Sequence, residues 1–330
     1  MTSTTPLVEI VSTGRFLPDR VVTNRDMESI VDTSDEWIFE RTGIRERRIA
    51  PPEMTAAAMG AGAARMAMER AGVAPEDVDI LIVSTATPDR LLPATSCDIQ
   101  ALIGATNAVA FDVVGACTGF LYALTVAEGY ISTGRGEIAL VIATEKLSAI
   151  VDWEDRSTCV LFGDGSGAAI VRSSAGEKGI LGTHHQSDGR LANLLYRPAG
   201  GAAIPMDEEV LRNRTHLIQM SGREVFKHAV RAMADSAGQA LARSGWALDD
   251  VDLVFPHQAN IRIIKATARY AGLPMEKVFV NVHRYGNMSS ATIPVAMDEA
   301  IEEGRLQPGM KLLLVAFGAG LTWGAMAVRW

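Results

Sequence analysis

At residues 70–81 the chain reads RAGVAPEDVDIL, and at residues 243–254 it reads RSGWALDDVDLV. The two stretches align without a gap at an offset of 173 residues. The same offset places the apolar segment 136–143 over the apolar segment 309–316. Two matches in one register indicate that the second half of the chain repeats the first.

Each half combines helices and strands in alternation. A helix is predicted over 55–71, a strand over 80–84, a second helix over about 117–132 and a second strand over 138–143. This alternation predicts an α/β fold with a parallel or mixed sheet covered by helices. Duplicating such a unit predicts five layers, in which two sheets alternate with three layers of helices.

The two halves are expected to form one compact unit, because no linker rich in proline, serine or charge separates them. The seam is predicted near 173–178. This boundary gives an N-terminal half of residues 1–178, which carries the candidate nucleophile described below, and a C-terminal half of residues 179–330.

Composition limits the classes of partner. The 330 residues are 48% hydrophobic and 21% charged, which is typical of a soluble globular protein. A formal net charge of −8 argues against nucleic acid as a partner, because surfaces that bind phosphates broadly are basic. Any acidic partner would have to meet a local basic patch.

Export and membrane insertion are not predicted. The first residues lack the basic and apolar segments of a secretory signal. The longest uncharged run, 312–328, is short for a membrane helix and contains glycines, so it predicts two buried strands joined by a glycine turn. Three cysteines without a C-x-x-C pair argue against a disulfide framework and a zinc ribbon. A cytoplasmic protein is therefore expected.

Cys117 is the candidate nucleophile. It follows a β-prone segment and precedes an apolar-periodic helix, so we place it at a helix N-terminus. Unpaired N–H groups and the helix dipole stabilise a thiolate at such a position and lower the thiol pKa. The alternative, a small buried residue in a tight turn, stays open at this point. Cys97 and Cys159 are predicted to be core residues.

Two further polar residues follow predicted strands or turns. His257 comes just after the apolar strand predicted over 251–255, where ligands collect in α/β sheets. Asn287 lies at the turn that corresponds to the Cys117 turn, although asparagine before a helix is usually a cap. A two-fold arrangement of the halves would bring these three loops to one face. The other histidines have no metal-ligand spacing, so no metal site is predicted.

Short motifs along nearly the whole chain carry a family resemblance. They are DEWI at 35–38, RTGI at 41–44, the segment 111–120 around Cys117, FGDG at 162–165, HQAN at 257–260, YGN at 285–287 and FGAGLTWG at 317–324. In these motifs the chain resembles the β-ketoacyl-acyl-carrier-protein synthase III enzymes, which are condensing enzymes of the thiolase superfamily. The resemblance implies the thiolase-like five-layered αβαβα fold.

The resemblance also implies a reaction. Cys117 would take the acyl group of an acyl-CoA starter, typically acetyl-CoA. Malonyl-acyl carrier protein would then enter, and His257 and Asn287 would hydrogen-bond its thioester oxygen as CO2 leaves. The product would be a 3-oxoacyl-acyl carrier protein, which initiates type II fatty acid synthesis. The N–H groups of Cys117 and Ala319 would form the oxyanion hole, and no cofactor is implied.

Further residues match family positions for substrates and partners. Those implied for CoA are Trp37, Arg41 and Arg156 at its adenine and phosphate end, and Met220, Gly222, Phe226, Ala259 and Asn260 along its pantetheine arm. Those implied for the carrier protein form a basic patch of Arg223, Lys227, Arg262 and Arg269. The family forms homodimers, and Leu92, in the loop 88–93, would close the acyl pocket of the partner subunit.

Three other functions compete with this one. A specialised relative in polyketide, quinolone or long-chain ketone synthesis would use another starter or a CoA-bound extender. A cysteine thioester hydrolase would share the cysteine and histidine, and a non-catalytic binding module would share the fold alone. The stretch GDGSG at 163–167 matches neither a hydrolase elbow nor a dinucleotide site and is predicted to be a turn.

Overall fold

The computed structural model describes residues 7–330, which form two mixed sheets. The first sheet has the order β1-β7-β6-β4-β5 and consists of β1 (Val8–Phe16), β7 (Asp164–Ser173), β6 (Ile138–Lys146), β4 (Ile80–Ser84) and β5 (Val109–Val113). The second has the order β11-β12-β13-β8 and consists of β11 (Leu253–Pro256), β12 (Lys311–Gly318), β13 (Thr322–Arg329) and β8 (Gly179–Ser187).

The two sheets repeat one topology. Strands β4, β6, β7 and β1 of the first correspond in order to β11, β12, β13 and β8 of the second. The pairing directions also agree: β4 with β6 and β11 with β12 are parallel, and the remaining corresponding pairs are antiparallel. The internal duplication predicted from the 173-residue offset is thereby confirmed. The boundary between 178 and 179, which falls between β7 and β8, stays a prediction.

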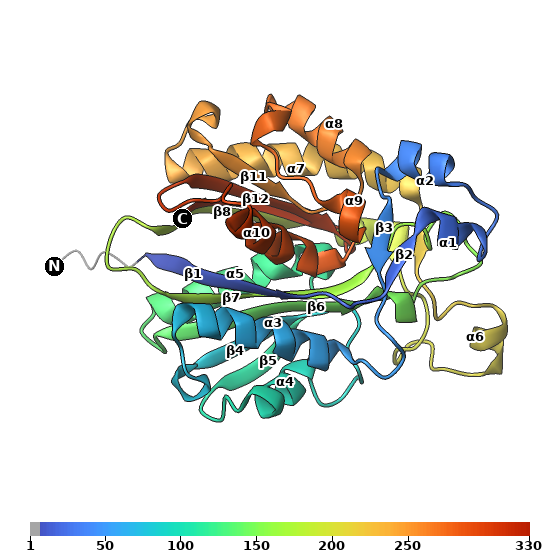
Figure 1. The fold of residues 1–330 in the computed structure, drawn as a ribbon, viewed down its shortest axis with the longest axis horizontal. Coiled ribbons are helices and arrows are strands. Elements are labelled where there is room, and N and C mark those ends of the chain that lie inside the picture. The colour runs from blue at the N-terminus through green and yellow to red at the C-terminus, as the bar shows by residue number, and fades with distance from the viewer. Residues whose placement is uncertain (1–6) are drawn as a thin grey trace.

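Helices cover both sheets in three layers (Figure 1). Two lie between the sheets, α5 (Gly119–Ser132) and α10 (Thr292–Glu302). Outside the first sheet lie α3 (Ala56–Ala71) and α4 (Thr95–Ile103), and outside the second lie α7 (Gly222–Ser244) and α8 (Ile261–Ala271). The predicted thiolase-like αβαβα architecture is confirmed.

Burial on both faces explains the uninterrupted apolar strands. In β6, Ala139 and Val141 pack in the central core with α5 and α10, whereas Leu140 and Ile142 pack in the outer core with α3. In a strand that is buried on both faces, apolar side chains are favoured at every position, so apolar and polar residues do not alternate. The run 312–328 forms β12 and β13, as predicted, and no helix within residues 7–330 is long and apolar enough to span a membrane.

Several short elements lie outside the layers, and some of those labelled in Figure 1 are at the right-hand end of the molecule. They are β2 (Val21–Thr23), α1 (Asn24–Glu28), α2 (Asp35–Thr42), β3 (Glu46–Arg48), β9 (Leu195–Tyr196), α6 (Glu208–Arg212), β10 (Gln219–Met220) and α9 (Val282–Tyr285). Residues of α2, β9 and β10 wall the cavity described below.

Two local predictions are wrong. Cys97 is exposed on α4 rather than packed in the core, whereas Cys159 is buried as predicted. The stretch 163–167 is not a turn, because from Asp164 onward it is part of β7. A Cβ on Gly165 would lie 2.6 Å from Met288 Sδ, and one on Gly167 would lie 2.7 Å from Pro294 Cγ. These glycines therefore permit close packing of a strand against the second half.

Candidate active site

Cys117 lies in a single 3-10 turn, Ala116–Thr118, directly before α5. Ala116 has φ 44°, in the left-handed region that side chains rarely adopt. The corresponding residue of the second half is Ser289, with φ 47°. Backbone strain of this kind is found where surrounding structure holds a functional turn in place. The same strained turn thus carries Cys117 in one half and lies beside Asn287 in the other.

One cavity brings the predicted catalytic residues together. It has a volume of about 750 Å³, and its walls include Cys117, His257, Asn287 and Ala319. Cys117 follows β5, His257 follows β11 and Ala319 follows β12, so strand ends of both sheets contribute to the cavity. Residues separated by up to 202 positions in the chain, Cys117 and Ala319, therefore line one space.

His257 is held as a neutral imidazole. Its backbone N–H donates to Val315 O at 2.7 Å, and its Nδ1 lies 2.7 Å from Thr292 Oγ1. Only 3% of the residue is exposed. This burial lowers the pKa of His257 to about 3, because a charged ring would lose its hydration.

Asn287 is oriented by its own turn. Its Oδ1 accepts a hydrogen bond from the Ser289 N–H at 2.8 Å, and its backbone N–H donates to Leu161 O at 2.8 Å. Because the side-chain oxygen is used in this way, Nδ2 is the group left to meet a ligand. A carboxamide donates without any change of protonation state.

Two backbone N–H groups belong to residues that line the cavity, Cys117 and Ala319. Within residues 7–330, neither the Cys117 N–H nor the Ala319 N–H has a hydrogen-bond acceptor. The end of β12 lies against the nucleophile turn so closely that a Cβ on Gly318 would be 2.8 Å from Cys117 N. Ala319 is not among the residues with positive φ, so an alanine fits this backbone without strain.

The thiol of Cys117 is not acidic in this structure, contrary to the expectation from its position before a helix. Burial raises its pKa to about 12, and the nearby Glu145 carboxyl adds to the rise, whereas a hydrogen bond with Ser289 opposes it. Loss of water around the sulfur outweighs the hydrogen bonds that favour the thiolate. Cys117 therefore rests as a thiol and has to lose its proton during the reaction.

Comparison with known proteins identifies the family. The family model of 3-oxoacyl-[acyl-carrier-protein (ACP)] synthase III matches residues 111–189, and that of its C-terminal part matches residues 241–330. A β-ketoacyl-[acyl-carrier-protein] synthase III from Desulfitobacterium hafniense is 49% identical over 323 residues, 98% of each chain. The chain belongs to the synthase III family. It is thus a condensing acyltransferase.

Solved structures of synthase III proteins agree with this fold. The crystal structure of 3-oxoacyl-[acyl-carrier-protein] synthase III from Aquifex aeolicus is 47% identical, with a TM-score of 0.91, and the match covers 98% of this chain and 100% of that one. A priming β-ketosynthase of a polyketide biosynthetic pathway is 35% identical with the same TM-score of 0.91, covering 98% of this chain and 96% of the other.

Most of the other residues taken from the synthase III resemblance line the same cavity. Those expected along CoA are Trp37, Arg41, Met220, Gly222, Phe226, Ala259 and Asn260, and those expected for a carrier protein are Arg223, Lys227 and Arg262. Asn260 also has a structural task, because its side chain caps α8 and donates to Arg41 O at 3.1 Å.

Three of the expected synthase III residues do not line the cavity. Arg156 lies beside it, with its guanidinium 5.0 Å from the centre of the Trp37 ring, while Arg41 lies 4.5 Å from the same ring. Arg269 is exposed near the far end of α8, and Leu92 is 86% exposed. A contribution of Leu92 to an acyl pocket would therefore require a second subunit.

Three residues of this synthase III site were not singled out from the sequence. Ser289 and Thr292 belong to the segment that carries Asn287, but their importance lies in hydrogen bonds that no spacing reveals. Glu145 is completely buried and accepts hydrogen bonds from Thr87 and Ser290, and burial raises its pKa to about 7. Within the described part of the chain, no group of three or more His, Cys, Asp or Glu residues could hold a metal ion.

Proposed function

We propose that this condensing enzyme joins an acyl-CoA starter, acetyl-CoA, to malonyl-acyl carrier protein with loss of CO2, and so starts type II fatty acid synthesis. The observation that supports this most is the cavity that unites a cysteine thiol, two unpaired N–H groups, a neutral histidine and an oriented carboxamide. Relatives with nearly half of their residues in common are named for the same reaction.

In the first half-reaction the sulfur of Cys117 attacks the acyl-CoA thioester carbon. The S–H bond breaks, and the proton passes to a base in the cavity. The oxygen of the tetrahedral intermediate lies between the N–H groups of Cys117 and Ala319, which were already free to receive it. The C–S bond to CoA then breaks, CoA takes up the proton, and the acyl group stays on Cys117.

In the second half-reaction malonyl-acyl carrier protein loses CO2. The electron pair of the broken C–C bond moves into an enolate, whose oxygen meets Nδ2 of Asn287 and a ring N–H of His257. The enolate carbon attacks the Cys117 thioester and forms the new C–C bond. The Cys117 thiolate leaves and takes a proton from water, so that one proton is consumed in each cycle.

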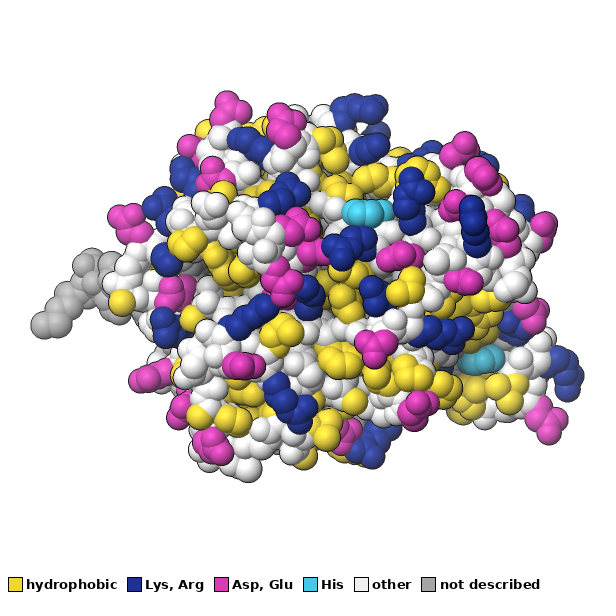
Figure 2. Space-filling view, viewed as in Figure 1, with side chains coloured by type: hydrophobic (Ala, Val, Ile, Leu, Met, Phe, Trp, Pro, Cys, Tyr) yellow, Lys and Arg dark blue, Asp and Glu magenta, His cyan; other side chains and the backbone are white. Residues whose placement is uncertain are grey.

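The mouth of the cavity suits phosphates and an acidic carrier. Arg223, Lys227 and Arg262 are all exposed there. Lys227 pairs with Glu224 at 2.7 Å, whereas Arg223 and Arg262 form no ion pair with residues 7–330. Elsewhere, on the face shown in Figure 2, acidic and basic side chains alternate over the described residues. A local basic patch can therefore steer a carrier to a protein of net charge −8.

The test is stepwise incubation followed by intact-mass measurement. Acetyl-CoA alone should add one acetyl group to the enzyme and none to a Cys117→Ala variant. Malonyl-acyl carrier protein should then remove that group as 3-oxoacyl-carrier protein. Release of free acetate without malonyl consumption would assign a thioester hydrolase instead. An enzyme that takes up no acyl group would be a binding module.

A specialised condensing enzyme is the second candidate, because a priming β-ketosynthase of polyketide biosynthesis is 35% identical. Competition among acetyl-CoA, longer acyl-CoA and branched acyl-CoA decides between the two. Preference for acetyl-CoA and for the carrier-bound extender supports the primary proposal, whereas preference for malonyl-CoA or a long starter supports the alternative.

We also propose a homodimer in which Leu92 closes the acyl pocket of the partner subunit. The neighbouring Leu91 is 79% exposed and Leu92 is 86% exposed, so two large apolar side chains are uncovered in the single chain. Leu92→Trp should shift starter preference toward the shortest acyl-CoA, and gel filtration should show two subunits. A monomer with full activity would contradict both statements.

A further inference from the structure

We propose that Arg47 is a positioning residue that fixes the place of Asn287, although it does not itself line the cavity. The inference rests on the proposed function and deepens it, because it names a group behind the cavity wall on which the second half-reaction depends. It follows from the contacts of a buried guanidinium group and from two glycines that lie against its side chain.

The guanidinium group of Arg47 is buried without an acidic partner. Arg47 is 0% exposed, and all four of its side-chain hydrogen bonds within residues 7–330 go to uncharged oxygens. Burial lowers the pKa of Arg47 to about 10, which leaves the group charged at neutral pH. A buried charged donor that loses an acceptor is costly, so this group holds its acceptor oxygens in place.

These acceptor oxygens come from two separate parts of the chain. Nη1 donates to Val22 O at 3.1 Å and to Asn24 Oδ1 at 3.0 Å, and Nη2 donates to Asn24 Oδ1 at 3.0 Å and to Val160 O at 2.8 Å. Val160 belongs to the cavity wall. Within residues 7–330, no backbone N–H donates to its carbonyl. Arg47 therefore ties this part of the wall to β2 and the start of α1.

Asn287 is paired with the same part of the wall. Its N–H donates to Leu161 O at 2.8 Å, and its carbonyl accepts from the Gly163 N–H at 3.0 Å. These two bonds form a parallel bridge between Phe162 and Asn287. Since both backbone groups of Asn287 are held by the segment 161–163, a displacement of that segment displaces the carboxamide.

The stem of Arg47 packs against this bridge. A Cβ on Gly163 would lie 3.1 Å from Arg47 Cβ, and one on Gly286 would lie 3.4 Å from it. These glycines flank the bridge, so no side chain separates Arg47 from the backbone on either side of Asn287. Arg47 thus supports the bridge with its stem and holds the adjoining carbonyl with its guanidinium group.

A displaced Asn287 would affect one half-reaction more than the other. In the proposed function its Nδ2 meets the enolate oxygen during condensation, whereas acetylation of Cys117 does not use it. The N–H groups of Cys117 and Ala319 lie beside η2 (Ala116–Thr118) and β12, which Arg47 does not contact through any hydrogen bond. Loss of Arg47 should therefore slow condensation selectively.

Arg48, the next residue of β3, provides a matched control. Its only side-chain hydrogen bond within residues 7–330 goes from Nη1 to Pro18 O at 3.3 Å, and it does not line the cavity. Arg48→Met therefore removes a guanidinium group from the same strand and leaves the contacts of the wall segment in place.

The experiment measures the two half-reactions separately in wild type, Arg47→Met, Arg47→Lys and Arg48→Met. Rapid-quench mass measurement gives the rate of Cys117 acetylation, and enzyme acetylated beforehand gives the rate of condensation with malonyl-acyl carrier protein. Arg47→Met should slow condensation roughly tenfold or more and acetylation less than about twofold, because a small displacement of a catalytic group is enough to lower a rate. Arg47→Lys should fall between Arg47→Met and wild type, and Arg48→Met should keep both rates.

A double variant distinguishes positioning from a general loosening of the fold. If Arg47 acts through Asn287, adding Arg47→Met to Asn287→Ala should slow condensation by less than about a further twofold. Full additivity of the two substitutions, or equal losses in both half-reactions of Arg47→Met, would overturn the inference.

A crystal structure of Arg47→Met should show the segment 160–163 and Nδ2 of Asn287 displaced, and an unmoved carboxamide would contradict the proposal. Wild type that takes up acetyl groups but does not condense them would instead refute the proposed function, and the crystal structure would still test the role of Arg47. If Arg47→Met shows no cooperative thermal transition, Arg47→Lys and Arg47→Gln carry the same comparison.

Discussion

Ser289 orients both hydrogen-bond donors of the second half-reaction through its peptide groups. Its N–H holds Oδ1 of Asn287, and its carbonyl accepts from Thr292, which in turn contacts His257. The left-handed backbone of Ser289 turns these two groups in different directions. One strained residue thus helps to orient the side chains of Asn287 and His257, which come from different loops.

Acidification should destabilise the protein through His257. The folded-state pKa of about 3 lies below the unfolded value near 6.5, so between these values the unfolded chain binds a proton that the folded chain excludes. The free energy of unfolding therefore falls as pH drops below about 6.5. His257→Gln removes this contribution, roughly 2 kcal/mol between pH 6.5 and pH 5.

Urea unfolding of wild type and His257→Gln at several pH values measures the difference. The slope of stability against pH is the relevant quantity, because a constant packing cost of the substitution cancels from it. His228→Gln, at an exposed histidine, is the control and should keep the wild-type slope. Equal slopes for wild type and His257→Gln would show that burial does not suppress protonation of this ring.

Sequence reasoning found the residue types of the site but not their protonation states. Cys117, His257 and Asn287 were predicted from strand ends, turns and the family motifs, and the structure places all three on one cavity. The acidity of Cys117 was predicted in the wrong direction, because the helix end is visible in sequence and the depth of burial is not. The surroundings of Glu145 were invisible for the same reason.

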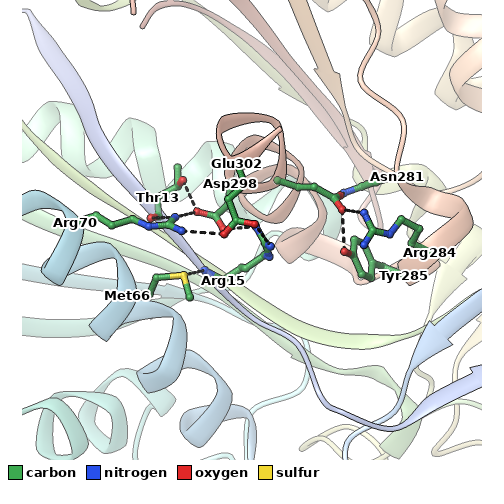
Figure 3. A network of polar contacts seen from close by, with 10 residues as sticks. Thr13, Arg15, Met66, Arg70, Asn281, Arg284, Tyr285, Asp298 and Glu302 are labelled. Atoms are coloured by element: carbon green, nitrogen blue, oxygen red, sulfur yellow. Dashed lines mark hydrogen bonds and ion pairs between the residues drawn. The ribbon is translucent and has the colours of Figure 1, made fainter. Parts of the chain in front are cut away.

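At the scale of elements, an ion network joins the two halves near α10. Asp298 is completely buried, accepts from Thr13 Oγ1 at 2.8 Å and pairs with Arg15 at 2.6 Å and with Arg70 (Figure 3). Glu302, one turn further along α10, pairs with the same two arginines. Strand β1 and helix α3 of the first half are thus tied to a helix of the second.

Asp298→Asn should destabilise the protein by about 3 kcal/mol, because the substitution keeps the shape but removes the buried charge of the pairs with Arg15 and Arg70. Glu302→Gln is the matched control and should cost less than about 1 kcal/mol, since the Glu302 side chain is 45% exposed. Chemical denaturation of the two variants measures both values. Equal effects would mean that burial of Asp298 does not govern the strength of this link.

The glycines of β7 show where element prediction failed. Clusters of glycine and aspartate usually indicate a turn, and 163–167 was interpreted in that way. In the fold, Gly165 and Gly167 lie against Met288 and Pro294, with no space for a side chain. The reason for these glycines is a contact with residues more than 120 positions away, which local sequence rules do not contain.

At the scale of the whole molecule, the repeat was the most informative feature. The 173-residue offset predicted two related sheets, and the strand orders correspond as expected. What the offset could not predict is which side chains share a core. The central core combines Phe120 and Leu124 of α5 with Ile293 and Met297 of α10, so its two sides come from different halves.

This shared core implies that neither half folds alone. A chain of residues 179–330 would expose the face of α10 that α5 covers, and a chain of residues 1–178 would expose the opposite face and leave Arg15 and Arg70 without Asp298. Loss of that much apolar burial exceeds the small net stability of a typical fold. Each half expressed separately should therefore lack slowly exchanging sheet amides in hydrogen-exchange measurements, whereas the intact chain should protect both sheets. A separate half with a cooperative thermal transition and protected amides would show instead that the duplication preserved two independently stable domains.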